Sequence, residues 1–369
     1  MITHSIAVVM GDGIGPEVCA AAIEVIQAAL GAGSRLEFCE YPAGAAHYLK
    51  AGDAFPEETF EGCRKADAIL HGAAGLPGVL LPDGTEAGPD FGLKIRSRLD
   101  LYANVRPIRL WPGLSSPLRR YPPRRIDYVV IRENTEGLYA SRGGGVVLRD
   151  EVATDTLMIT RKGTERVVRF AFELARTRAG APRDGKRRVT ACDKANVLRS
   201  YAFFRRVFTE VAAEYPDVAA DYAYVDAMTV HQVTRPDFYD VVVAENIFGD
   251  IISDLGAATV GSMGMSPAAE LGDHHGFFQA SHGSAPDIMG QGIANPLGTI
   301  LAGALMLTWL GERKQDSTLP QAATRIERAV ETVLASGKTL TRDLGGQASS
   351  AEMTKAVCEA LRVTRTERE

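Results

Sequence analysis

Short apolar runs alternate with helical patterns along the chain. The first run, residues 6–10, is followed by the sequence GDGIGPE and then by apolar residues three or four positions apart between residues 18 and 29. Residues at that spacing lie on one face of a helix, whereas a short apolar run bounded by turn residues is typical of a buried strand. Because strand and helix patterns alternate, the sequence predicts an α/β fold with a largely parallel sheet.

Four later apolar runs end in polar or charged residues. These segments are DYVVIRENTEG, RVTACDKANV, DYAYVDAM and DVVVAENIFGD. The side chains that follow the runs are Arg132 and Glu133, Lys194 and Asn196, Asp226, and Asn246 and Asp250. In open α/β sheets, ligands bind beyond the carboxyl ends of the strands. One such strand carries little information, since every strand ends in something polar, but four in succession favour a binding site.

The longest apolar run, residues 297–310, follows Pro296. It is shorter than the ~20 residues that a membrane-spanning helix needs, and proline is favoured at the start of a helix. We therefore predict a buried core helix there. No basic region precedes the first apolar run, so a signal peptide is not expected. The five cysteines form no CxxC pair, and we expect free thiols in a reducing, cytoplasmic setting.

The composition is that of an ordinary globular protein. Hydrophobic residues make up 46% and charged residues 24% of the 369 positions, which excludes a disordered chain, a collagen and a small disulfide scaffold. The length suggests two domains. The net charge of -5 gives no electrostatic footprint for DNA or RNA, so nucleic acid is not an expected partner, and the short apolar run at residues 297–310 makes a membrane an unexpected one.

The segment NIFGDIISD places Asp250 and Asp254 four residues apart. On a helix these carboxylates share one face and repel each other. The repulsion disappears if Mg²⁺ or Mn²⁺ lies between them, because both ions prefer oxygen ligands. A solvated helix face is the alternative. Residues 236–312 contain no Lys or Arg that would neutralise the pair, which favours a metal ion.

Basic and phenolic side chains near the strand ends suggest chemistry on a carboxylic acid. Arg96, Arg106 and Arg132 suit bidentate binding of carboxylates. A desolvated Lys194 can act as a base near neutral pH, and Tyr139 can supply a proton as a general acid. A half-buried core tyrosine is the alternative for Tyr139.

Other basic and glycine-rich segments receive different interpretations. Arg98 and the basic stretch of residues 119–125 are expected to be solvated. GDGIGPE has Pro16 where a dinucleotide-binding fingerprint needs glycine, so it predicts a tight strand-to-helix turn. Residues 282–296, HGSAPDIMGQGIANP, predict a loop whose backbone N–H groups suit phosphate binding.

Together, GDGIGPE, RENTEGLY, DKANV, VDAM, FGDIISDL, HGSAPDI and DLGG resemble the metal-dependent β-decarboxylating dehydrogenases. That family includes isocitrate, homoisocitrate, 3-isopropylmalate, tartrate and D-malate dehydrogenases. The resemblance covers essentially the whole chain and is nearest to the 3-isopropylmalate and tartrate/D-malate branches. It implies an isopropylmalate-dehydrogenase-like fold, without Rossmann topology, in which two domains share a long mixed, largely parallel sheet.

The resemblance also implies which residues form each domain and what each domain binds. Residues 1–102 with 261–369 would form a discontinuous cofactor-side domain, and residues 103–260 would form the substrate, metal and dimerisation domain. A homodimer follows, with each active site built from both chains. The reaction would be NAD-dependent oxidative decarboxylation of a malate substituted at carbon 3, with Mg²⁺ or Mn²⁺.

Carried onto this sequence, the resemblance assigns roles to individual residues. The metal would be bound by Asp226, Asp250 and Asp254, with Asp226 and Lys194 supplied by the other subunit. Lys194 would take the hydroxyl proton, Tyr139 would protonate carbon 3, and Asp226 completes the catalytic set. The substrate would be contacted by Arg96, Arg106, Arg132, Leu93, Asn196 and Val197. The adenosine half of the cofactor would be bound by His282, Gly283, Ser284, Ala285, Pro286, Asp287, Ile288 and Asn295. An acid at Asp287 would repel a 2′-phosphate, so we expect NAD rather than NADP.

The substrate is less narrowly defined. Leu93 stands where homoisocitrate enzymes carry Arg, and an unpaired Asp90 would repel a third carboxylate. A malate with a small or apolar carbon-3 substituent is therefore favoured, with Phe91, Leu93 and Val197 as a possible apolar pocket. Isocitrate and homoisocitrate stay as alternatives. Gln279 replaces the acid of the family's usual Glu-Pro-Val, so a catalytically weakened regulatory or binding paralog is a further alternative.

Overall fold

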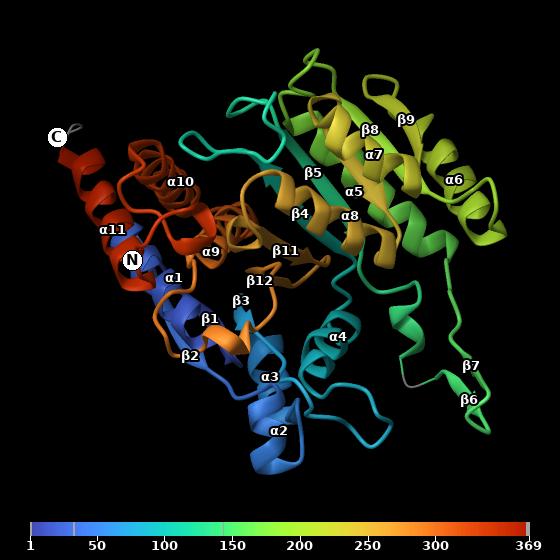
Figure 1. Cartoon of the computed structure of the whole chain (residues 1–369), viewed down its shortest axis with the longest axis horizontal. Helices are drawn as coiled ribbons and strands as arrows, with labels where there is room; N and C mark the ends of the chain where they lie inside the picture. The colour runs from blue at the N-terminus through green and yellow to red at the C-terminus, as the bar shows by residue number, and fades with distance from the viewer. Residues whose placement is uncertain (1, 32–33, 143, 367–369) are drawn as a thin grey trace. The chain divides into compact units, whose positions relative to one another are not determined.

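The computed structural model describes residues 2–31, 34–142 and 144–366. The chain divides into two compact units. The first contains Met1–Leu99, Trp111–Leu114 and Gly261–Glu369, and the second contains Asp100–Leu110 and Ser115–Val260. Both units combine helices with a mostly parallel sheet, which confirms the α/β fold class (Figure 1).

The strands of the first unit are hydrogen-bonded in the order β2-β1-β3-β12-β11. Their bounds are β1 Ile2–Gly11, β2 Ser34–Glu40, β3 Ala68–Ala73, β11 Pro267–Leu271 and β12 Gly276–Ala280. β1 runs parallel to β2 and β3, β12 runs parallel to β3, and β11 is antiparallel to β12. β1 contains the apolar run of residues 6–10, which confirms the first predicted strand.

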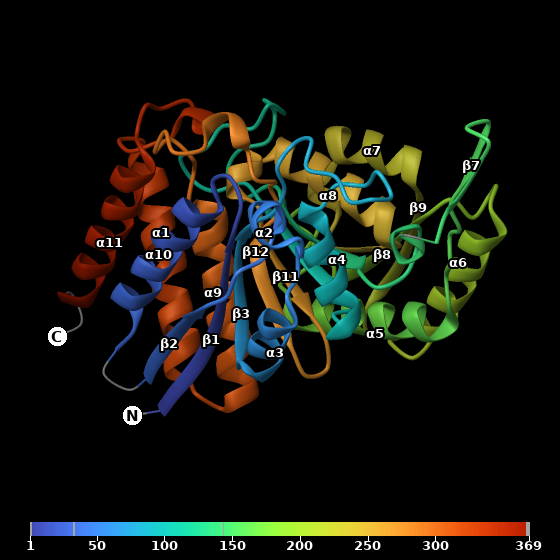
Figure 2. The ribbon, with the colours of Figure 1, turned by 90° about the horizontal axis from the view of Figure 1, so that it is seen from below.

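The helices of the first unit pack on this sheet. Their bounds are α1 Gly15–Ala29, α2 Ala45–Ala51, α3 Glu57–Lys65, α4 Gly88–Arg98, α9 Leu297–Lys314, α10 Thr318–Ser336 and α11 Ser350–Thr366, with 3-10 turns η3 Met263–Met265, η4 Pro286–Ile288 and η5 Arg342–Leu344. α9 is buried along most of its length and contacts α1, α10 and β12 (Figure 2). The predicted core helix after Pro296 is therefore confirmed.

The strands of the second unit are hydrogen-bonded in the order β4-β5-β10-β8-β9. Their bounds are β4 Ala103–Arg109, β5 Asp127–Glu133, β8 Arg188–Asp193, β9 Ala219–Tyr224 and β10 Val241–Ala244, and the helices are α5 Arg161–Thr177, α6 Arg199–Ala212, α7 Val225–Thr234 and α8 Asn246–Thr259. β4 and β5 are antiparallel, whereas β5, β10, β8 and β9 are parallel. The polar residues after these parallel strands therefore lie at one edge of the sheet, as the sequence predicts.

A separate two-stranded antiparallel ribbon extends from the second unit. It consists of β6 Val146–Leu148 and β7 Val152–Thr154, and every residue of both strands is exposed. Figures 1 and 2 both show it projecting from the other elements of its unit. The remaining short turns are η1 Tyr139–Ser141 and η2 Pro236–Phe238. A two-stranded ribbon on its own is at best marginally stable in water.

The cysteines and the long helices follow the sequence predictions. All five cysteines have free thiols, and four of them are buried. Within the described ranges, no helix has the length and apolar character needed to span a membrane. GDGIGPE forms a turn that leads from β1 into α1, with Pro16 in the first helical turn.

Candidate active site

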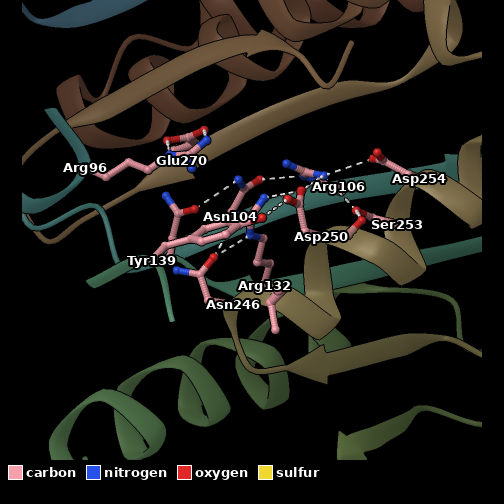
Figure 3. A network of polar contacts seen from close by, with 12 residues as sticks. Arg96, Asn104, Arg106, Arg132, Tyr139, Asn246, Asp250, Ser253, Asp254 and Glu270 are labelled. Carbon is pink, nitrogen blue, oxygen red and sulfur yellow. Dashed lines mark hydrogen bonds and ion pairs between the residues drawn. The ribbon is translucent and has the colours of Figure 1, made fainter. Parts of the chain in front are cut away.

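Arg132 is a buried member of a polar cluster in the second unit. It lies on β5 with an exposed fraction of 1%. Its Nε and Nη2 atoms donate to Asn246 Oδ1 at 2.9 and 2.7 Å, and its Nη1 donates to Asp250. Asn246 begins α8 and donates from Nδ2 to the Glu136 carbonyl at 2.9 Å. The amide of Asn246 therefore fixes the guanidinium group of Arg132 (Figure 3).

Asp250 and Asp254 lie on one face of α8, as the spacing predicts. Arg106 on β4 donates from Nη1 to Asp250 Oδ1 at 3.0 Å and to Asp254 Oδ1 at 3.3 Å. The same nitrogen donates to Ser253 Oγ at 2.8 Å. Burial raises the pKa of the Asp254 carboxyl and the Asp250 charge adds to the rise, whereas the positive charge of Arg106 opposes it.

This geometry corrects one part of the sequence argument. The absence of basic residues from positions 236–312 suggested that nothing neutralises the two aspartates. Arg106 and Arg132 do so from β4 and β5, more than a hundred residues earlier in the chain. The two carboxylates still converge on one cationic position, which is the arrangement that a divalent ion requires of oxygen ligands.

Tyr139 belongs to the same cluster. It lies half-buried in η1, and its hydroxyl donates to Asp250 Oδ2 at 3.0 Å. The guanidinium carbon of Arg132 is 5.3 Å from the centre of its ring. The structure therefore brings together Arg106, Arg132, Tyr139, Asp250 and Asp254.

Lys194 and Asp226 form a pair of their own. Lys194 follows β8, Asp226 lies in the first turn of α7, and Lys194 Nζ is 2.5 Å from Asp226 Oδ1. This hydrogen bond lowers the pKa of the exposed Asp226 carboxyl. No three His, Cys, Asp or Glu side chains among the described residues are grouped so that they could bind a metal ion. Asp226 thus does not complete a metal site with Asp250 and Asp254 of its own chain.

The remaining apolar and amide candidates for substrate binding differ in their exposure to solvent. Asn196 and Val197 are both exposed, Val197 to 67%. Leu93 on α4 is half-buried. Phe91, by contrast, is fully buried and packs edge-on against Phe55. Phe91 is a core residue, so its predicted place in an apolar pocket is wrong.

Arg96, at the carboxyl end of α4, lies in the first unit and is held by a buried carboxylate. Its Nε and Nη2 atoms are 2.8 and 2.7 Å from the two carboxylate oxygens of Glu270 on β11. Gln279 on β12 donates from Nε2 to Glu270 Oε1 at 2.8 Å. Figure 3 shows the paired Arg96 and Glu270 side chains. Sequence reasoning identified Arg96 and the unusual Gln279 but not Glu270, because the motif SPAAELG gives no local sign of a buried acid.

Asp90 is not the unpaired acid that the sequence argument assumed. Its carboxylate lies 2.6 Å from Lys94 Nζ, one helical turn along α4. The lysine was available in the sequence at the i,i+4 spacing that favours such pairs. The repulsion expected from Asp90 toward a third carboxylate is therefore offset by Lys94.

The predicted cofactor loop is fixed to the β1–α1 turn of the first unit. The Ser284 hydroxyl donates to the Gly75 carbonyl at 2.5 Å, and the Ile14 N–H donates to the Ser284 carbonyl at 2.8 Å. Ala285 and Ile288 pack against a small apolar cluster that contains Ile14. These contacts order the backbone of the loop before any ligand binds.

The loop residues differ in whether their polar groups already have hydrogen-bond partners within the protein and in how exposed they are. His282 Nε2 is buried and has no hydrogen-bond partner among the described residues, and burial lowers the pKa of this imidazole. Asn295 donates to Asp343 at 2.9 Å and accepts from the Leu297 N–H at 3.0 Å. Gly283 and Asp287 are exposed, and Pro286 is half-buried. A buried nitrogen without a partner beside exposed loop groups fits a polar ligand at this loop.

Asp12 is a residue of this region that sequence reasoning missed. It is 2% exposed, and its carboxylate accepts the N–H groups of Ala45, Ala46 and Gly75 at 2.8, 2.8 and 2.7 Å. The sequence signal that could have identified Asp12 is its position between two glycines in GDG. Gly11 and Gly13 have φ of 75° and 60°, so the backbone on both sides of Asp12 adopts a conformation that favours glycine. Asp12 links the turn to the segment that carries Gly75.

Comparisons with known proteins cover nearly the whole chain. The sequence model of the isocitrate/isopropylmalate dehydrogenase family matches residues 5–360. The 3-isopropylmalate/3-methylmalate dehydrogenase of Methanocaldococcus jannaschii is 45% identical over 360 residues, which cover 97% of this chain and 99% of that protein. A probable tartrate dehydrogenase/decarboxylase of Bacillus subtilis is 39% identical over 369 residues, which cover 98% and 99%.

A solved structure gives the same result in three dimensions. The isocitrate dehydrogenase of Methylococcus capsulatus superposes with a TM-score of 0.85 and 37% sequence identity, over 97% of this chain and 99% of that chain. The likeness confirms the fold implied by the sequence motifs.

Proposed function

Because the chain belongs to the isocitrate/isopropylmalate dehydrogenase family, we propose that it catalyses the NAD-dependent oxidative decarboxylation of a carbon-3-substituted (R)-malate. The family and its relatives indicate an oxidative decarboxylating dehydrogenase. The products would be a 2-oxo acid, carbon dioxide and NADH, as for substrates of the 3-isopropylmalate, D-malate or tartrate type. The observation that carries the proposal is the convergence of Arg106, Arg132 and Tyr139 on the aspartates of α8.

The arginines bind the substrate in this proposal. Arg106 and Arg132 lie close enough to share Asp250, and each guanidinium group can accept a carboxylate in two parallel hydrogen bonds. Arg96, which belongs to the first unit, binds a further carboxylate of the substrate. Relatives whose names include 3-isopropylmalate and 3-methylmalate support an apolar substituent at carbon 3.

The α8 aspartates fit a divalent cation. Asp250 and Asp254 offer hard oxygen ligands that converge on one cationic nitrogen in the present structure. With Asp226 of a second copy they would hold Mg²⁺ or Mn²⁺. When bound, that ion supplies positive charge that makes a nearby substrate hydroxyl more acidic and stabilises negative charge on a neighbouring oxygen.

Proton transfer falls to Lys194 and Tyr139. Lys194 of a second copy accepts the proton of the substrate hydroxyl at Nζ. Tyr139 donates its phenolic proton to carbon 3 after carbon dioxide has left. The Tyr139 hydroxyl lies 3.0 Å from Asp250 Oδ2, beside the proposed metal ligands, and a positioned acid contributes about 10²–10⁴-fold to a rate.

The loop of residues 282–295 binds the adenosine half of NAD in this proposal. Its ordered backbone, the buried Nε2 atom of His282 and the exposed Asp287 support that role. The carboxylate of Asp287 accepts hydrogen bonds from ribose hydroxyls and repels a 2′-phosphate. NAD held by this loop would supply the acceptor for the hydride that leaves carbon 2.

A substrate panel tests the proposed function. The purified protein is assayed with Mn²⁺ and either NAD or NADP on 3-isopropylmalate, D-malate, tartrate, isocitrate and homoisocitrate. We expect reduced nicotinamide with at least one of the first three acids, a preference for NAD, and loss of turnover when the metal is chelated. Absence of turnover on every acid, with folded protein and metal present, contradicts the proposal, and equal use of NADP contradicts the role of Asp287.

A further inference from the structure

Glu270 is a fully buried acid whose charge is directed at Arg96. Its side chain has an exposed fraction of 0%, and its two oxygens meet Nε and Nη2 of Arg96 at 2.8 and 2.7 Å. This is the bidentate geometry in which a carboxylate and a guanidinium group bind most strongly. The positive charge of Arg96 is therefore offset before a substrate carboxylate arrives.

Gln279 holds Glu270 in place without adding charge. Glu270 on β11 faces Phe277 on β12, and Gln279 lies two positions further along β12, opposite Ala268. From this diagonal position the Gln279 amide donates to Glu270 Oε1 at 2.8 Å. Arg96, Glu270 and Gln279 together carry no net charge. A glutamate at position 279 would instead give the group one negative charge.

Arg132 shows that a neutral group can hold Nε and Nη2 of a buried arginine in this chain. Nε and Nη2 of Arg132, the same two atoms that Arg96 directs at Glu270, bind the neutral amide oxygen of Asn246. The Nη1 atom of Arg132 donates to the carboxylate of Asp250, which belongs to the proposed metal ligands. Positioning alone therefore leaves the negative charge of Glu270 unexplained.

We propose that Glu270, fixed by Gln279, is a specificity-determining residue that selects substrates with two carboxylates over substrates with a third. The inference rests on the proposed function, in which Arg96 binds a substrate carboxylate. A carboxylate beside Arg96 repels an incoming anion and offsets the attraction of the guanidinium group. The penalty grows with each carboxylate on the ligand, and such repulsion is a common source of specificity.

Two ligands that differ by one carboxylate provide the test. Glutarate and tricarballylate share a five-carbon chain, tricarballylate carries an additional carboxylate on its central carbon, and neither has a hydroxyl group to oxidise. Their dissociation constants are measured by calorimetry on the full-length protein with Mn²⁺. The readout is the ratio of the two constants, which turnover does not affect.

Three variants separate charge from structure. Glu270→Gln removes the charge and is expected to tighten tricarballylate relative to glutarate by about tenfold. Gln279→Glu adds a charge and is expected to change the ratio in the opposite direction. Asp240→Asn is the matched control, because Asp240 is equally buried, 2.7 Å from Arg178, and precedes β10 at the opposite end from the cluster. Its ratio should equal that of the wild type.

The outcomes are distinct. An unchanged ratio in Glu270→Gln overturns the proposal, because loss of a merely structural ion pair would weaken both ligands alike. If Glu270→Gln does not fold, the test rests on Gln279→Glu. The proposal is overturned if that variant does not bind tricarballylate more weakly, relative to glutarate, than the wild type does. Absence of measurable binding of both ligands to wild type and variants also overturns it. A wild type that binds with the expected ratios but turns over no hydroxy acid contradicts the proposed function and leaves the charge selection intact.

Discussion

Arg96, Arg106 and Arg132 have the same residue type but different partners. Arg132 is held by the neutral amide of Asn246 at Nε and Nη2 and by Asp250 at Nη1, Arg96 by a buried carboxylate, and Arg106 by the aspartates of α8. The charge that each can offer to a ligand therefore differs. The sequence identified the three arginines, but their partners lie more than a hundred residues away, so no local pattern predicted them.

Asn246 offers a test of how Arg132 is positioned. Asn246→Leu leaves Nε and Nη2 of a buried guanidinium group without their acceptor, and we expect the free energy of unfolding to fall by about 2 kcal/mol. Asn246→Asp keeps an acceptor and adds a negative charge. It should unfold closer to the wild type, while KM for a dicarboxylate substrate rises by about tenfold because the added charge offsets Arg132.

Urea denaturation and steady-state kinetics on the same preparations provide both measurements. An Asn246→Leu variant as stable as the wild type would show that water or another side chain replaces the amide. An Asn246→Asp variant with unchanged KM would show that Arg132 does not bind a substrate carboxylate.

Helix α8 can reach β5 only because position 249 lacks a side chain. A Cβ atom at Gly249 would lie 2.7 Å from Arg132 Cβ and 2.8 Å from Arg132 Cγ. The glycine in FGDIISDL thus allows the helix that carries Asp250 to pack directly on the strand that carries Arg132. Carboxylate and guanidinium groups then meet at hydrogen-bond distance. The sequence predicted the helix but gave no reason for the glycine.

Gly249→Ala therefore has an effect opposite to that of an ordinary helical Gly→Ala change. Overpacking against Arg132 should lower the free energy of unfolding by about 1–3 kcal/mol. Gly92→Ala on α4 is the matched control, because a Cβ there meets nothing within 4 Å. It should raise the free energy of unfolding by up to about 1 kcal/mol through helix propensity. Urea denaturation of both variants gives the two values, and equal shifts would argue against close packing at Gly249.

At the scale of the whole molecule, the second unit leaves large apolar side chains exposed. They lie on the ribbon and on helices α7 and α8, which contact each other, and include Val146, Val147, Leu148, Val152, Val230, Val233 and Ile251. Exposed apolar side chains that gather on one face occur at protein–protein interfaces. The proposed metal site also needs an Asp226 that its own chain does not place beside Asp250. Both observations support a homodimer in which each copy completes the site of the other.

Val147→Glu tests this homodimer. Val147 is 68% exposed at the centre of β6, and a charge there should dissociate the dimer and abolish activity, because the third metal ligand and Lys194 are lost together. Leu49→Glu is the matched control, since Leu49 is 66% exposed on α2 of the first unit. Light scattering after size-exclusion chromatography should give a monomer for the first variant and a dimer for the second. A monomeric wild type, or a Val147→Glu dimer with full activity, would contradict the homodimer proposal.

The sequence by itself determined the elements of this protein and the residue types at its strand ends. It predicted the strand before GDGIGPE, the buried helix after Pro296 and the shared face of Asp250 and Asp254, because each depends on the spacing of near neighbours. The tertiary structure alone decided which residues far apart in the chain meet. Arg106 neutralises the α8 aspartates, Glu270 offsets Arg96 and Phe91 packs in the core. Contacts of this kind join segments far apart in the chain, where periodicity carries no information and only packing sets the distance.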